Sequence, residues 1–585
     1  MADTALLCQG NQLGTSSLTS DVLNARDQSP SSTCDVIGLP AGVHKHVIPS
    51  RSRALAMFGR SSRYALIMAD NEKRSIIEDI TLGGRTAEDE SEQLARYFVE
   101  TEQWRKVWQD EVDIVFAPKG GGKSAIYSML ASRDGELFDN GIVLVPGENP
   151  TGATAFESIQ DVPPTSETEF IQIWRLYFLV LIIEELERYD VKSSKLEAVR
   201  DALVSIGLTR GAKAKRTIIV RVREALDKLL SPGGLEATMS VDSATGTPTG
   251  FTAKVMFDEP SAAQEQAGLV SVDRLYEDVN DVVKQEHLNI WLILDRLDVA
   301  FTASPELEAN ALRALFRVYK LIEPLKSLRL KIFLRSDIWA EITAGGFRET
   351  SHITRSMDLV WNRASLLKLI TQRVIQSESL MKELAATPEA VIASSSAQQD
   401  FFNQVFPRQV DAGSNKPATF DWAISRTEDG KKIAAPRELI HLFTAVRDRQ
   451  LARLDTGQAA IAPNIYFEAQ SFRDAHPEVS STRLQTTMYP EYPWLKDWLE
   501  KLRGQRTLQD VESLEAVWGT PRAETQERVK RLLDVGFFEP RGTVSDRSYW
   551  VPFLYRPALE MVQGTADSLR SRLAETGPVA GEEPE

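Results

Sequence analysis

Cysteine is scarce in this sequence of 585 residues, in which only Cys8 and Cys34 occur. Two thiols cannot form the disulfide framework of a secreted domain or a cysteine-based zinc site. Histidine is also rare, with six residues, of which His44 and His46 are the only close pair. A single HKH stretch is more typical of a solvated turn than of a metal site. The scarcity of thiols favours a reducing cytoplasm.

Long apolar runs are missing as well. The most apolar run, residues 176–183, lies between Arg175 and Glu184 and is far shorter than the roughly 20 residues that a membrane-spanning helix needs. The first residues, MADTALLCQGNQ, have neither the basic start nor the apolar core of a signal peptide. We therefore expect a cytoplasmic protein with no membrane partner.

Positive charge is in deficit. The 68 Lys and Arg residues face 83 Asp and Glu residues, so the formal net charge is −15. This balance argues against a chain whose whole surface binds nucleic acid, although a local basic patch is compatible with it. One basic segment is present, because the Lys and Arg residues of positions 44–63 have no acidic neighbour. The length predicts about three to five domains or subdomains.

The strongest motif of the sequence is the glycine-rich stretch in residues 111–126, EVDIVFAPKGGGKSAI. An apolar strand is predicted over 112–116 and a helix over 123–132. A strand, a glycine loop and a helix in this order are typical of the phosphate-binding loop, G-x-x-x-x-G-K-[ST], whose backbone N–H groups surround phosphates. The predicted nucleotide-binding residues are Ala117, which replaces the first glycine of the motif, Pro118, Lys119, Gly120, Gly121, Gly122, Lys123 and Ser124.

Lys123 and Ser124 carry the chemistry of such a loop. The lysine bridges the terminal phosphates, and the hydroxyl that follows it binds Mg²⁺. The alternative is a glycine turn with a surface lysine, because the triplet GKS also arises by chance. The strand before the loop and the helix after it favour the nucleotide site, so the predicted cofactors are ATP and Mg²⁺.

A second apolar strand, residues 290–294, ends in an acidic residue, as the other half of such a site requires. Asp295 is predicted to hold the Mg²⁺ ion and its water shell. Asp298 is the candidate for orienting the attacking water. Alternatively, Asp298 caps the helix that follows it.

Four stretches resemble, in their order along the chain, the bacterial P-loop ATPases at the STAND and KAP end of the AAA-related class. They are KGGGKS at 119–124, LILDRLD at 292–298, KIFLRSDIW at 331–339 and APRELIHL at 435–442. The resemblance covers about residues 95–450. Proteins of this kind are found in antiphage defence systems.

The resemblance implies roles for two arginines. Arg335 follows the strand beside the acidic one and would sense the terminal phosphate, and Arg437 would contact the same phosphate from a helical lid. An always-charged, bidentate guanidinium suits both tasks. Each arginine could instead form an ordinary structural ion pair. The sequence departs from the family pattern at Val299, where an acid is expected.

The resemblance also implies a function. Members of the class often act as nucleotide-driven switches that work with a separately encoded effector, and they often assemble into homo-oligomers. The sequence holds no nuclease, protease or redox motif and no repeat array, so a partner would supply the output. Two alternatives are a DNA-dependent ATPase that binds duplex DNA and a nucleotide-bound scaffold without turnover.

The C-terminal part predicts three helices and a short ribbon, the pattern of a winged helix. Five basic residues of its third helix and wing would face solvent and could meet a DNA backbone: Arg528, Lys530, Arg531, Arg541 and Arg547. Acidic residues are interleaved with them. Packing against the ATPase, or protein binding, is therefore the favoured alternative.

Strands alternate with helices over about residues 110–340, which predicts a parallel sheet between helices. We expect an α/β fold, with a parallel-sheet P-loop NTPase core, a helical lid and a C-terminal winged-helix domain. The predicted domains are a partly disordered N-terminal extension, 1–90, the ATPase core, 91–375, with an insertion near 190–285, the lid, 376–485, the winged helix, 486–565, and a disordered acidic tail, 566–585.

Overall fold

The computed structural model of the chain describes residues 73–87, 89–90, 92–147, 166–208, 218–230, 239–241, 248–251, 255–266, 268–297, 305–344, 346–459, 465–543 and 546–566. The predictions for the basic segment, for Asp298 and Val299, and for the tail beyond residue 566 lie outside the described residues. All described residues belong to one compact unit of the chain, 66–585.

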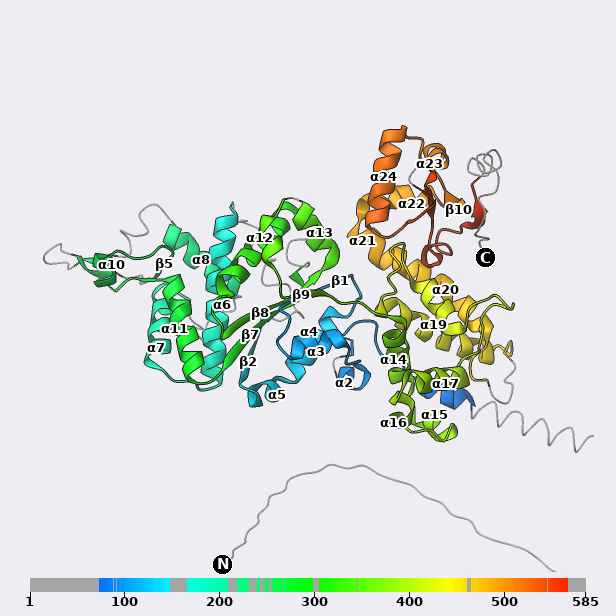
Figure 1. The fold of residues 1–585 in the computed structure, drawn as a ribbon, viewed down its shortest axis with the longest axis horizontal. Coiled ribbons are helices and arrows are strands. Elements are labelled where there is room, and N and C mark those ends of the chain that lie inside the picture. Colours follow the sequence, from blue (N-terminus) through cyan, green and yellow to red (C-terminus); the bar gives the residue numbers. More distant parts are fainter. Residues whose placement is uncertain are drawn as a thin grey trace, which may run out of the picture. The chain divides into compact units, whose positions relative to one another are not determined.

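A sheet of five parallel strands forms the centre of the α/β part, in the order β2, β7, β8, β1, β9 (Figure 1). This sheet confirms the predicted α/β class. Strands β7 and β8 are buried along nearly their whole length, as expected for a parallel sheet that is covered on both faces. The strands are β1 (Ile114–Ala117), β2 (Ile142–Pro146), β7 (Asn289–Leu294), β8 (Leu328–Arg335) and β9 (Ser356–Asp358).

Helices cover the two faces of this sheet. Alternate residues of β1 divide between them, because side chains of a strand point to opposite sides in turn: Val115 joins one apolar core and Phe116 the other. The core of Val115 is covered by α3 (Glu102–Trp108), α4 (Lys123–Ser132) and α5 (Asp134–Asp139). The core of Phe116 is covered by α6 (Glu167–Arg188), α11 (Val272–Gln285), α12 (Pro305–Ile322) and α13 (Ser336–Ala344).

Helix α6 contains the most apolar run of the sequence. All its residues from Ile173 to Ile183 are buried, because other helices and the sheet surround it. Trp174 Nε1 donates a hydrogen bond to the carbonyl oxygen of Ala311 in α12 at 2.8 Å. A helix that is buried all round needs no polar face, so the run is a core helix. None of the helices in the described residues is long and apolar enough to cross a membrane.

The described part of the predicted insertion between β2 and β7 holds three helices, α7, α8 and α10, and short strands. Its strands β3 and β4 pair antiparallel. β5 and β6 pair parallel. The elements are α7 (Ser194–Ser205), α8 (Ile218–Leu230), β3 (Met239–Val241), β4 (Pro248–Phe251), β5 (Val255–Met256), α10 (Ala262–Gln266) and β6 (Val270–Ser271).

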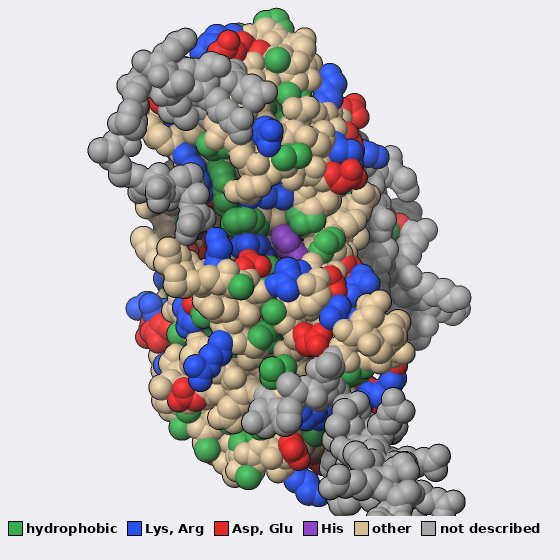
Figure 2. Space-filling model, turned by 90° about the vertical axis from the view of Figure 1, so that its right-hand side faces the viewer, with side chains coloured by type: hydrophobic (Ala, Val, Ile, Leu, Met, Phe, Trp, Pro, Cys, Tyr) green, Lys and Arg blue, Asp and Glu red, His purple; other side chains and the backbone are tan. Residues whose placement is uncertain are grey.

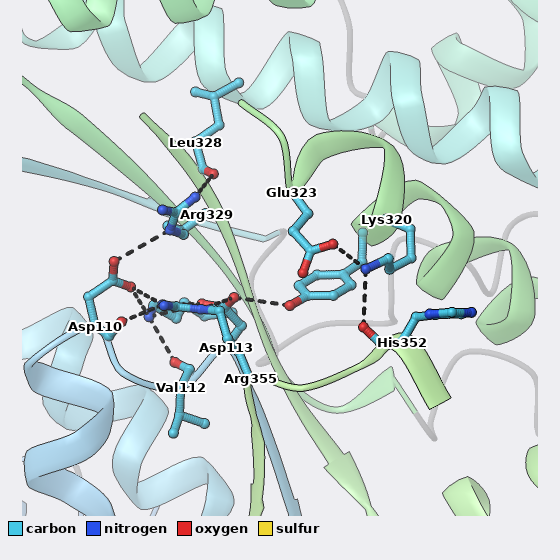
Figure 3. A network of polar contacts seen from close by, with 11 residues as sticks. Asp110, Val112, Asp113, Lys320, Glu323, Leu328, Arg329, His352 and Arg355 are labelled. Atoms are coloured by element: carbon cyan, nitrogen blue, oxygen red, sulfur yellow. Dashed lines mark hydrogen bonds and ion pairs between the residues drawn. The ribbon is translucent and has the colours of Figure 1, made fainter. Parts of the chain in front are cut away.

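A cluster of charged side chains lies beside the amino end of β1 (Figure 3). Asp113 is 3% exposed and accepts hydrogen bonds from Tyr319 Oη at 3.1 Å and from Arg355 Nε at 2.7 Å. Lys331 of β8 is 1% exposed and donates to both Asp110 and Asp113. The cluster explains why an aspartate precedes an otherwise apolar strand. It lies at the opposite end of β1 from the glycine loop.

The described residues of 363–459 and 465–488 are mainly helical and share one apolar core, in which Phe402, Phe406 and Phe443 contact one another. We call them the helical region. Its elements are α14 (Arg363–Val374), α15 (Glu378–Glu383), α16 (Pro388–Ile392), α17 (Ser395–Val405), α18 (Thr419–Thr427), α19 (Pro436–Asp455), α20 (Ala469–Thr482) and the π-helix η4 (Arg483–Met488).

Residues 489–566, the C-terminal region, contain the three predicted helices and the predicted ribbon, β11–β12. The ribbon is part of a larger sheet in the order β11, β12, β10, β13, so the prediction missed two strands. The winged-helix assignment stays a prediction. The elements are α21 (Tyr489–Glu491), η5 (Pro493–Leu495), α22 (Lys496–Glu500), β10 (Arg506–Gln509), α23 (Val511–Trp518), α24 (Arg522–Asp534), β11 (Glu539–Arg541), β12 (Ser548–Trp550), η7 (Phe553–Tyr555) and β13 (Val562–Thr565).

Candidate functional site

The glycine loop connects the carboxyl end of β1 to the first turn of α4. Gly120 and Gly122 have φ angles of +80° and +100°, in the left-handed region that favours glycine. A Cβ atom on Gly121 would lie 2.9 Å from the carbonyl oxygen of Pro118 and 3.0 Å from the Cβ of Ala117. Gly122 is the N-cap of α4, so Lys123 begins the helix. The free N–H groups of such a helix start attract anions.

Ala117 replaces the first glycine of the motif without backbone strain. It is the last residue of β1, pairs with Arg335 of β8 and is 1% exposed. Its φ angle is not positive, so its backbone lies outside the left-handed region. An alanine therefore satisfies the backbone at this position, and its methyl group packs in the core under the loop.

The chain leaves β1 and its neighbour β8 toward opposite faces of the sheet, since α4 follows β1 on one face and α13 follows β8 on the other. In open parallel sheets, ligands bind beyond the carboxyl ends of the strands at such a switch point. The glycine loop and Arg335 both lie there. The topology thus points to the same place as the motif.

Lys123 is folded back over the loop. Its Nζ donates hydrogen bonds to the carbonyl oxygens of Ala117 at 3.0 Å and Pro118 at 3.3 Å. Ser124, the next residue, is half-buried in the first turn of α4. The ammonium group and the hydroxyl group therefore both belong to the helix start that faces the loop.

Asp295 directly follows β7 and is half-buried. Burial, and after it the charge of Asp295, raise the pKa of Tyr127 in α4. Asp295 therefore lies near Tyr127 of α4, the helix that begins with Lys123. Asp298, the residue predicted to orient the water, lies outside the described residues.

Arg335 is the last residue of β8 and is buried. Its guanidinium forms a bidentate ion pair with Asp337, with Nε–Oδ1 at 3.1 Å and Nη2–Oδ2 at 2.6 Å, and Nη1 donates to Glu491. Burial alone would lower the pKa of Arg335, but Asp337 and Glu491 outweigh it and raise this pKa. Burial alone would raise the pKa of the Asp337 carboxyl, but hydrogen bonds from Arg335 and Tyr492 lower it to about 2.

Arg437 reaches the loop from the helical region. Helix α19 begins with Pro436, and the N–H of Arg437 donates to the carbonyl oxygen of Gly120 at 3.4 Å. A Cβ atom on Gly120 would lie 3.0 Å from the Cβ of Arg437. The buried Nε of Arg437 has no hydrogen-bond partner among the described residues. The first turn of α19 thus lies against the glycine loop.

Three further residues contact the loop or its neighbours and were not predicted from the sequence. Trp361, which follows β9, donates from Nε1 to the carbonyl oxygen of Gly121 at 2.8 Å. Glu491 accepts from Lys119 of the loop, and Tyr492 donates to Asp337. No motif marks these residues, because only the folded chain brings them to the loop.

A cavity of about 540 Å³ lies between residues 81–93 and helix α19. Its lining includes Asp89, Glu90 and Glu92 together with Arg447. Three carboxylates against one guanidinium make this lining less favourable for a phosphate than the glycine loop.

The basic residues predicted to meet DNA are only in part available. Arg528 forms an ion pair with Glu524, lies over the ring of Trp498 at 4.9 Å and is 16% exposed. The expectation that Arg528 faces solvent is therefore wrong, because Trp498 of α22 covers it. Lys530, Arg531 and Arg547 are exposed, as predicted. On the face shown in Figure 2, Lys and Arg side chains are interspersed with Asp and Glu side chains.

No protein-family model and no curated protein matches the sequence. Two solved structures of the ORC2 protein of Aeropyrum pernix are among those similar to this chain. The form with ADPNP and ADP has 12% identity and a TM-score of 0.35 and covers 84% of this chain and 96% of that one. The ADP form has 10% identity and a TM-score of 0.27 and covers 84% and 94%.

Proposed function

We propose that this protein binds ATP at the glycine loop and hydrolyses it with Mg²⁺. One observation carries the proposal: Gly120 to Gly122 turn at the switch point of a parallel sheet, with Lys123 at the start of α4. This combination presents backbone N–H groups and an ammonium group to the same anion.

The residues around the loop fit a bound triphosphate. Gly121 keeps the backbone free of a side chain where a Cβ would collide with Pro118. The buried Nε of Arg437 has no hydrogen-bond partner among the described residues, and a phosphate oxygen would satisfy it. Hydrogen bonds from charged donors to phosphate are stronger than those to neutral carbonyls, so Lys123 would prefer a phosphate to its present acceptors.

Each predicted residue has a role in this proposal. Lys123 and the loop N–H groups hold the phosphates, and Ser124 and Asp295 would hold Mg²⁺. Arg335 and Arg437 would contact the terminal phosphate, and Asp298 would orient the water. Mg²⁺, when bound, would supply charge neutralisation at the transferring phosphoryl group.

The biological role that we propose is a molecular switch in bacterial antiphage defence that controls a separately encoded effector and acts as a homo-oligomer. It is supported by the order of the four motif stretches, which resembles that of the STAND and KAP ATPases. For the C-terminal region we favour packing on protein over binding duplex DNA. The packing of the Arg528 guanidinium against the ring of Trp498 supports this choice, because it makes the arginine less accessible to DNA.

Replacing Lys123 by methionine tests the site. We expect the variant to bind ATP roughly a hundredfold more weakly, since it loses a charged hydrogen-bond donor to phosphate. Isothermal titration calorimetry with Mg²⁺ and ATP measures the affinity, and phosphate release measures turnover. Lys382→Met, at an exposed position of α15, is the matched control. Equal binding by the Lys123 variant and the wild-type protein would refute the site.

A further inference from the structure

A carboxylate from the beginning of the C-terminal region reaches the glycine loop. Glu491 is the last residue of α21, and its side chain is 20% exposed. Its two oxygens accept hydrogen bonds from Lys119 in the loop and from Arg335 at the end of β8. One acidic side chain thus connects two cations that flank the candidate phosphate site.

The residue after Glu491 adds a second connection to the same arginine. Tyr492 Oη donates to Asp337 Oδ2 at 2.6 Å, and Asp337 holds Arg335 in its bidentate pair. Arg335 is therefore shared between two carboxylates. Burial opposes ionisation of Glu491, but Lys119 and Arg335 together lower its pKa below the ordinary value, so the carboxylate is charged at neutral pH.

The chain around Glu491 has little freedom. Pro490 and Pro493 flank it, and proline fixes one backbone angle. The π-helix η4 comes directly before α21, and π-helical turns are frequent at functional sites. After Pro493 the chain continues into α22 and the C-terminal sheet. A displacement of Glu491 would therefore be transmitted to the C-terminal region.

We propose that Glu491 is an internal competitor of the terminal phosphate: it occupies Lys119 and Arg335 in the nucleotide-free protein, and bound ATP displaces it. A carboxylate and a phosphate are like charges that use the same N–H donors, so binding of the phosphate weakens the hold of Lys119 and Arg335 on Glu491. Release of Glu491 would free the C-terminal region from the loop and so report nucleotide binding to a partner. This inference rests on the proposed ATP site.

The test compares Glu491→Gln with the wild-type full-length protein. Glutamine keeps the shape and removes the charge, so we expect a non-hydrolysable ATP analogue with Mg²⁺ to bind about tenfold more tightly, within the usual range of coupling between sites. Glu500→Gln is the matched control. Glu500, the last residue of the neighbouring α22, accepts from Tyr489 Oη at 2.6 Å and pairs with Arg503. The affinity of the Glu500→Gln variant for the analogue should equal that of the wild type.

Hydrogen exchange of residues 483–500 supplies a second readout. In the wild-type protein, the analogue should raise hydrogen exchange in this segment. In Glu491→Gln, exchange there should already be higher than in the wild type when no analogue is present. If the Gln variant does not fold, Tyr492→Phe serves instead, because it removes only the hydrogen bond to Asp337. We expect about threefold tighter binding from it.

The outcomes separate this inference from the proposed function. If the wild-type protein and Glu491→Gln bind the analogue equally well, the competition is refuted and the ATP site stands. If neither binds, the ATP site is refuted and the competition with it. If Glu491→Gln binds the analogue more tightly than the wild type does, the result supports the ATP site and the competition.

Discussion

His476 of α20 is a buried histidine between two arginines. It is 9% exposed, and its ring lies 6.0 Å from that of Trp422. Burial, followed by the charges of Arg426 and Arg556, lowers its pKa to about 4. The imidazole is therefore neutral in the folded protein at pH 7, and the folded state resists its protonation.

This neutral histidine predicts a loss of stability in acid. The unfolded chain binds a proton at His476 below a pKa of about 6.5, whereas the folded chain binds it only near 4, so the free energy of unfolding falls as the pH falls between these values. From pH 7 to pH 4.5 the loss is about 2 kcal/mol. Thermal unfolding across this range should show a steeper decline for the wild type than for His476→Gln. If the stability of both proteins declined equally with falling pH, the low pKa of His476 would be contradicted.

At the residue scale the loop was predictable and its surroundings were not. Gly120 to Gly122, Lys123 and Ser124 form a contiguous motif whose chemistry follows from residue type and spacing. Glu491 contacts Arg335 across 156 residues of sequence. No local pattern encodes that pair, because an ion pair between distant residues depends on how whole elements pack.

At the scale of elements, the charged cluster of Asp113, Lys331 and Arg355 joins three parts of the sheet. Asp113 precedes β1, Lys331 lies within β8 and Arg355 directly precedes β9. Lys331 also lies over the ring of Trp291 in β7 at 4.3 Å. Burial lowers the pKa of Lys331, and the charges of Asp110 and Asp113 offset only part of this decrease. The buried ammonium therefore depends on its acidic partners.

Removing Asp113 should destabilise the sheet. Asp113→Ala leaves the buried Lys331 and the half-buried Arg355 with one acidic partner fewer, and breaking a buried ion pair typically costs about 3 kcal/mol. Urea denaturation measures the free energy of unfolding. Asp139→Ala, at an exposed position of α5, should change it by less than about 0.5 kcal/mol. A similarly small effect at Asp113 would show that the cluster is not a stabilising element.

Elements with a clear apolar run were predicted, whereas the short strands β9, β10 and β13 were not. The apolar strands β7 and β8 and the helix α6 stand out by composition. Strand β9 has three residues, and β10 begins with Arg506 and ends with Gln509. Such strands are specified by pairing with neighbours rather than by their own apolar pattern. The sequence therefore predicted the parallel sheet and the ribbon β11–β12, but not the strands that enlarge the sheets.

At the scale of the whole chain, the glycine loop is a meeting point of distant segments. β8 contributes Arg335, the segment after β9 contributes Trp361, α19 contributes Arg437 and α21 contributes Glu491. A nucleotide at the loop would therefore contact both the sheet and the helical region. Binding to such a site stabilises every element that it joins, because only the folded arrangement binds.

Arg437 provides the last test of this coupling. We expect ATP to reduce hydrogen exchange in the first turn of α19 in the wild-type protein, because the phosphate would accept a hydrogen bond from the buried Nε of Arg437. Arg437→Ala should lose this protection and bind ATP about tenfold more weakly. Arg447→Ala is the control on the same helix, since its guanidinium donates to the carbonyl oxygen of Ile80 instead of lying at the loop. If ATP still protects the first turn of α19 in Arg437→Ala, then α19 responds to the nucleotide through backbone contacts alone, such as the hydrogen bond from the N–H of residue 437 to the carbonyl oxygen of Gly120. The side chain of Arg437 would then have no part in closing the helical region over the site.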